Sequence, residues 1–198
     1  FNIFNLSNIS DILYNIVFVT TLINKIINLH YFSMKNSTTE LISQIIQLDD
    51  CPFTKYEVHG FFIGLASSSI DKEAKYEKAK KFLDLSSNTH SMIYELMKIT
   101  CLGLSKNELE IYPTSLKDSQ QISNALSEWA YYFLISYTNS ASSNNADEQE
   151  ILDIFDEISQ VNDKYKLDDE DSSANSLSDI NGFIIKSALY LFHRSSNE

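Results

Sequence analysis

Residues Thr54 to Ser69 read TKYEVHGFFIGLASSS, and the other helices are expected to pack around this stretch. Thr54 and, three residues later, Glu57 form a capping-box pattern, in which each side chain accepts a hydrogen bond from the backbone amide of the other residue. A helix is therefore predicted to begin here. Beyond the cap, apolar side chains recur at helical spacing and form a wide apolar face, made by Val58, Phe61, Phe62 and Leu65. The sequence predicts that this helix lies in the core.

Gly60 and Gly64 lie one helical turn apart in the same stretch. Glycine inside a helix is less favourable than alanine by about 1 kcal/mol, and the whole chain has only four glycines. Because a missing Cβ lets a second backbone come close, the pair predicts a crossing at which another helix packs tightly against this one.

Length and composition favour one helical domain. A chain of 198 residues can enclose a substantial core, and 4 Gly with 2 Pro are too few for a turn-rich β-sandwich. We therefore predict the all-α class, with a single multi-helical domain of about six to seven helices packed around the helix at 54–69.

Capping residues and apolar periodicity indicate the other helices. In the helix after Thr89 the expected core residues are Ile93, Leu96, Met97 and Leu102. The acidic stretch at 163–175 predicts a mobile loop. The expected helix starts are, in chain order, Ser37 or Thr38, Asp71, Asn88 or Thr89, Asp118 or Ser119, Asp147 and Ser176.

Residues 1–33 differ from the rest of the chain, and three interpretations stay open. We favour upstream sequence read through from a mis-assigned start, because Met34 opens an ordinary polar beginning to an amphipathic helix. A membrane or export segment is the second interpretation, although polar residues interrupt the run of about 20 apolar residues that a membrane helix needs. A native helical extension is the third. The domain proper is expected at 34–198.

The net charge and the cysteines of the chain argue against several kinds of partner and site. A net charge of -12 argues against a nucleic-acid or anionic membrane partner, because binding phosphates requires clustered Lys and Arg. Cys51 and Cys101 are isolated and lack the spacing of a zinc site or a disulfide framework. We therefore expect a cytoplasmic protein with free thiols.

Three separated stretches carry a family likeness. The first is Glu57-Val-His59-Gly60-Phe-Phe-Ile-Gly64-Leu65. The second is Pro113 followed by Ala125-Leu126-Ser-Glu128-Trp129 and Phe133-Leu134, and the third is residues 150–159 with Asp179-Ile180 and Phe183-Ile184. Together they resemble the YgfB/YecA family of small all-α bacterial proteins, whose molecular role is largely uncharacterised. The resemblance implies a structural or interaction role for Glu57, His59, Gly60, Gly64, Pro113, Leu126, Trp129 and Phe133.

The chain also departs from that family pattern. Tyr132 and Ser136 stand where the family carries glycines, and Thr114-Ser115 replaces an aspartate run. Ile122 and Ile185 replace basic residues. The longer relatives append a cysteine-rich metal-binding tail that this sequence does not show, so we expect no metal and no other cofactor.

His59 is the polar residue best suited to chemistry on the central helix. A general base needs a substrate proton and an orienting partner, and no GxSxG, paired-cysteine or paired-carboxylate arrangement is visible. A hydrogen-bonded structural histidine is predicted, and Trp129 is expected in the core. The spacing of acidic residues from Asp168 to Asp179 weakly resembles a calcium loop, but Ser173 replaces the required glycine, so a solvated loop is expected.

Two function classes stay open. The first, which we favour, is a non-enzymatic protein-interaction or regulatory module with an unidentified protein partner, homo-oligomerisation being left open. The second is a small enzyme or ligand-binding protein that uses His59 with a carboxylate brought near by folding, such as Glu57 or Glu128. A pocket holding His59 beside an acid favours the second class, and a fully packed His59 favours the first.

Overall fold

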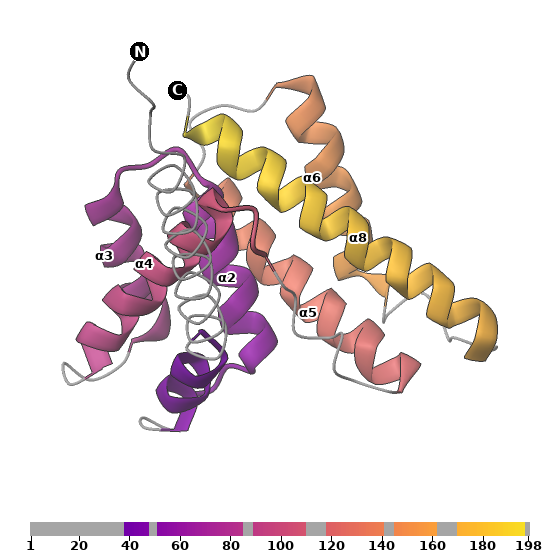
Figure 1. Cartoon of the computed structure of the whole chain (residues 1–198), viewed down its shortest axis with the longest axis horizontal. Helices are drawn as coiled ribbons and strands as arrows, with labels where there is room; N and C mark the ends of the chain where they lie inside the picture. The colour runs from indigo at the N-terminus through magenta and orange to yellow at the C-terminus, as the bar shows by residue number, and fades with distance from the viewer. Residues whose placement is uncertain are drawn as a thin grey trace, which may run out of the picture. The chain divides into compact units, whose positions relative to one another are not determined.

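The computed structural model describes residues 38–47, 51–84, 89–109, 118–140, 145–161 and 170–196. Over these residues the chain is helical, with turns and no strand, so the predicted all-α class is confirmed (Figure 1). Residues 1–40 and 41–198 form two compact units. The three interpretations of residues 1–33 lie outside the described residues, as does Pro113.

Six long helices belong to the second unit, and residues 38–47 are also helical. The long helices are α2 (Lys55–Ser67), α3 (Lys72–Leu83), α4 (His90–Ser105), α5 (Ser119–Thr138), α6 (Ala146–Ser159) and α8 (Glu170–Ser195).

Three of the predicted N-caps are confirmed. At the start of α2, Thr54 Oγ1 accepts from the Glu57 amide at 3.3 Å, and Glu57 Oε2 accepts from the Thr54 amide at 2.6 Å. Asp71 and Asp118 each accept from the amide three residues on, at 2.9 Å and 2.8 Å. These bonds satisfy amides that have no partner within the helix, which is why the helices begin where the sequence indicates.

The last two helices begin earlier than expected. A second capping box, between Asn145 and Glu148, starts α6 at Ala146. Helix α8 starts at Glu170, so the structure differs from the expected loop at residues 170–175, whose backbone is helical. Acidic residues early in a helix are favoured by the helix dipole. A helical backbone also does not form the loop that the calcium-like spacing requires.

Helix α2 is the centre of the second unit. Its residues from Val58 to Ser67 are all buried, so no side of the helix faces solvent there. Helices α3, α4, α5 and α8 pack against it, while α6 packs against α5 and α8 (Figure 1). A helix that is buried all round forms the interior of a domain, and the predicted central position of this stretch is confirmed.

One side chain of α4 was placed wrongly by the sequence pattern. Ile93, Leu96 and Met97 are buried as predicted, but Leu102 is 36% exposed. Thr100 and Leu104 complete the buried stripe instead. Positions 93, 97, 100 and 104 follow the helical period, whereas position 102 lies on the opposite side of the helix.

The buried hydroxyl group of Thr100 leads to a first prediction about stability. Its hydroxyl is buried and has no hydrogen-bond partner among the described residues. Since an unsatisfied buried hydroxyl costs free energy and valine has nearly the same shape, Thr100→Val should raise the free energy of unfolding by about 1 kcal/mol. Urea denaturation of the purified protein measures the change.

Thr138→Val is the matched control. The Thr138 hydroxyl is exposed and donates to the Leu134 carbonyl oxygen at 2.7 Å, so this variant should gain no stability. A Thr100→Val protein that is less stable than wild type would mean that the Thr100 hydroxyl forms a stabilising bond after all.

No helix in the described part of the chain is both long enough and apolar enough to cross a membrane.

Candidate functional site

The crossing of α2 and α5 is built around two glycines. A Cβ atom added at Gly60 would overlap the Trp129 carbonyl group, lying 2.9 Å from its carbon and 3.0 Å from the Trp129 Cα. One added at Gly64 would overlap the Phe133 carbonyl group and Ser136 Oγ. Real Cβ atoms are not found that close to backbone atoms. The close helix crossing that the sequence predicted is therefore present, and α5 is the partner helix.

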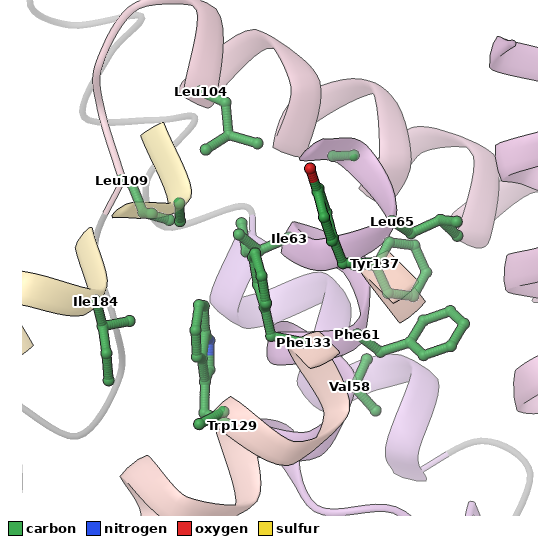
Figure 2. Close-up of a cluster of buried hydrophobic side chains, with 14 of the residues drawn as sticks. Val58, Phe61, Ile63, Leu65, Leu104, Leu109, Trp129, Phe133, Tyr137 and Ile184 are labelled. Carbon is green, nitrogen blue, oxygen red and sulfur yellow. The ribbon is translucent and has the colours of Figure 1, made fainter. Parts of the chain in front are cut away.

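Aromatic rings from α5 and α6 pack beside this crossing. Trp129 and Phe133 are fully buried, and their rings stack with centroids 5.3 Å apart. Phe155 of α6 lies 4.7 Å from Phe133, and Tyr137 stacks on Phe133 at 5.8 Å. Figure 2 shows Trp129, Phe133 and Tyr137 along α5 within the apolar cluster. The expected core position of Trp129 is confirmed.

His59 is buried at the same crossing. It is 3% exposed, and its Nδ1 accepts a hydrogen bond of 3.1 Å from Trp129 Nε1. A neutral imidazole that accepts at Nδ1 carries its proton on Nε2. Burial lowers the pKa of His59 from 6.5 to about 3, because a charged ring would lose its hydration. At neutral pH this histidine is therefore uncharged and packed.

The two carboxylates that the enzyme interpretation paired with His59 hold the helix cap instead. Glu57 accepts from the Thr54 amide, and Glu128 Oε2 accepts from Thr54 Oγ1 at 2.9 Å. Glu57 is also hydrogen-bonded to Tyr132. Folding therefore brings Glu57 and Glu128 together at the N-terminus of α2.

Tyr132 joins this cap from α5. Burial, followed by the Glu57 and Glu128 carboxylates, raises the pKa of Tyr132 to about 12. The phenol is therefore protonated at neutral pH and acts as a hydrogen-bond donor. In the sequence, Tyr132 stood out only as a departure from a glycine of the family pattern, and no role at a site was predicted for it.

The residues singled out by the sequence fall into four groups. Glu57 lies at the helix cap, Leu126 is buried in α5, and Pro113 lies outside the described residues. The rest meet at the crossing of α2 and α5, and they are His59, Gly60, Gly64, Trp129 and Phe133.

One ion pair between a buried glutamate and a half-buried arginine was missed at the sequence level. Glu148 is only 5% exposed, and its Oε1 lies 2.9 Å from Arg194 Nε. The pair links the first turn of α6 to the last turn of α8. Local signals were present, since an acid early in a helix and an arginine late in one both suit the helix dipole, but neither signal identifies the partner.

Metal-ligating side chains and thiols are the remaining candidates for chemistry in the described part of the chain. No three His, Cys, Asp or Glu side chains lie together there in a way that would hold a metal ion. Cys51 and Cys101 are half-buried. Burial raises the pKa of the Cys101 thiol, which keeps it in the poorly nucleophilic thiol form at neutral pH.

No protein-family model matches the chain, and a search of curated proteins finds no match either.

Proposed function

We propose that this protein is a non-enzymatic interaction module with a regulatory role, working in the cytoplasm through a protein partner, as a member of the YgfB/YecA family that its sequence resembles. The observation that supports this best is the packing of His59, the side chain most suited to catalysis. It is buried and hydrogen-bonded to Trp129 in the core.

The neighbouring groups support the same proposal. A general base works best when its pKa is near the operating pH, and burial lowers the pKa of His59 to about 3. The Glu57 and Glu128 carboxylates are hydrogen-bonded to Thr54, whereas His59 is hydrogen-bonded to Trp129. The site therefore resembles a structural support more than a reaction centre.

A direct test begins with affinity capture from the native host, followed by reconstitution of the complex from purified components and calorimetry. The proposal predicts saturable binding with a defined stoichiometry. It also predicts that a folded His59→Asn variant binds as wild type does, because His59 is in the core. If the wild-type protein turned over a substrate and the folded His59→Asn variant did not, the enzyme alternative would be right.

The net charge of -12 predicts that binding depends on salt. A basic partner is attracted over long distances, and this attraction raises the association rate at low ionic strength. Raising salt from about 0.01 M to 0.15 M shortens the screening length from about 30 Å to about 8 Å. The association rate constant measured by stopped flow should therefore fall by about tenfold or more, while the dissociation rate changes less. An association rate that does not respond to salt would contradict electrostatic steering.

A further inference from the structure

Aromatic side chains gather at the N-terminal end of α2. Phe53, just before the helix, stacks on Phe82 of α3 with ring centroids 4.4 Å apart, and Tyr132 of α5 meets Phe53 edge-on at 5.7 Å. Tyr131 adjoins Tyr132 at 5.3 Å and is 51% exposed, more than any other large hydrophobic side chain described. We refer to Phe53, Phe82, Tyr131 and Tyr132 as the aromatic face.

Two carboxylates border the aromatic face. Glu57 and Glu128 both bond to Thr54, and both lie close enough to Tyr132 to raise its pKa. The described residues provide no ion-pair partner for either carboxylate, since the ion pairs present there involve Glu77, Glu95 and Glu148. The face therefore combines aromatic surface with unneutralised negative charge.

Three other tyrosines of this protein make cation–π contacts with lysines of the same chain. The Nζ atoms of Lys55, Lys72 and Lys80 lie 4.7–5.1 Å from the ring centroids of three tyrosines, which are Tyr56, Tyr94 and Tyr76 respectively. Within the described part of the chain, no lysine or arginine lies over Tyr131 or Tyr132 in this way. Tyr132, which lies next to the two carboxylates, and its neighbour Tyr131 therefore have no cation of the described residues over their rings.

We propose that the aromatic face binds an arginine-bearing segment of the protein partner, an inference that rests on the proposed function. A guanidinium group stacks on an aromatic ring, and its N–H groups suit carboxylate oxygens. The rings of the face touch one another, so they leave no cage between them. The arginine side chain lies over the outer surface of Tyr131, with its N–H groups directed toward Glu128 and Glu57.

The test uses a synthetic peptide of alternating Ala and Arg as the probe, with an alternating Ala and Glu peptide as the charge-reversed control. NMR titration of the full chain should show saturable shifts of the Tyr131 and Tyr132 ring signals with the arginine peptide only. Tyr131→Ser and Glu128→Gln should each raise its dissociation constant about fivefold, by loss of the cation–π contact and of one charge. The glutamine still offers an oxygen to Thr54 Oγ1, and Tyr131 is exposed, so both variants should fold.

Two matched variants test whether the effect is local. Tyr190 is 42% exposed on α8, and Glu150 is exposed on α6. Tyr190→Ser and Glu150→Gln should leave the dissociation constant unchanged. If they weaken binding as much as Tyr131→Ser does, the peptide is held by the overall charge and the proposed site is wrong.

Two further outcomes would overturn the site. If sedimentation shows that the chain self-associates and that Tyr131→Ser abolishes this without changing peptide binding, the face contacts a second copy of the chain. If a purified native partner binds wild type and Tyr131→Ser equally, the partner docks elsewhere, and the interaction function stands without this surface. Failure of the proposed function itself would appear differently, as substrate turnover that depends on His59.

Discussion

We expect Gly60→Ala and Gly64→Ala each to lower the free energy of unfolding by about 3 kcal/mol. Adding side-chain volume to a packed interior typically costs about 1–3 kcal/mol. Here the added methyl group meets the backbone carbonyl groups of Trp129 and Phe133, which cannot rotate away as a side chain does. The gain of about 1 kcal/mol in helix propensity does not offset that overlap. Denaturant midpoints and thermal unfolding measure the loss.

The size of the new side chain and the choice of site provide controls. Gly64→Leu should prevent folding, whereas Leu65→Met nearly preserves volume and should cost less than about 1.5 kcal/mol. Gly182 lies inside α8, and a Cβ added there would meet no atom within 4 Å. Gly182→Ala should therefore stabilise the protein by about 0.5–1 kcal/mol. Equal effects of alanine at Gly64 and at Gly182 would show that α5 does not cross α2 at this distance.

The buried His59 predicts that stability decreases in acid. Its pKa is 6.5 in the reference state and about 3 in the folded protein. Above pH 6.5 the ring is neutral in both states, so it adds no pH dependence. Between about pH 6.5 and 3 the unfolded chain binds a proton that the folded protein does not, and stability falls by about 1.4 kcal/mol per pH unit. Below the pKa of the folded protein, the stability that the neutral His59 contributes is fully lost.

His59→Asn isolates this contribution from that of the many carboxylates. The asparagine carbonyl oxygen can accept from Trp129 Nε1 and does not titrate in this range. Urea unfolding from pH 7 to pH 4 should show wild type losing more stability than His59→Asn by about 1.4 kcal/mol for each pH unit below 6.

Trp129→Phe separates the hydrogen bond from the titration. This variant removes the donor and should cost about 1–3 kcal/mol at neutral pH, because His59 Nδ1 loses its partner in the core. It should keep the pH slope, since the histidine stays buried. A wild-type slope in His59→Asn would mean that His59 is not the group that titrates.

Local signals in the sequence were enough to define most of the helices. The caps at Thr54, Asp71 and Asp118 could be predicted because capping joins residues three positions apart. Such a contact depends on the local sequence and not on the rest of the fold. The same holds for the glycine pair, since two missing Cβ atoms one turn apart predict a close neighbour. In α4 the apolar Leu102 was predicted to be buried because it is hydrophobic. The structure buries Thr100 instead, because position 100 lies on the helix face that packs against the core and position 102 does not.

The all-α class, the central helix and its glycine face thus follow from local patterns in the sequence, whereas the groups that meet at the helix crossing depend on how the helices pack. Trp129 donates to His59 across 70 positions, and Thr54 bonds to Glu128 across 74. Such pairs depend on which helix packs against which and at what rotation. Periodicity and capping report only contacts within one or two turns of a single helix, so they carry no information about partners that far apart in the chain.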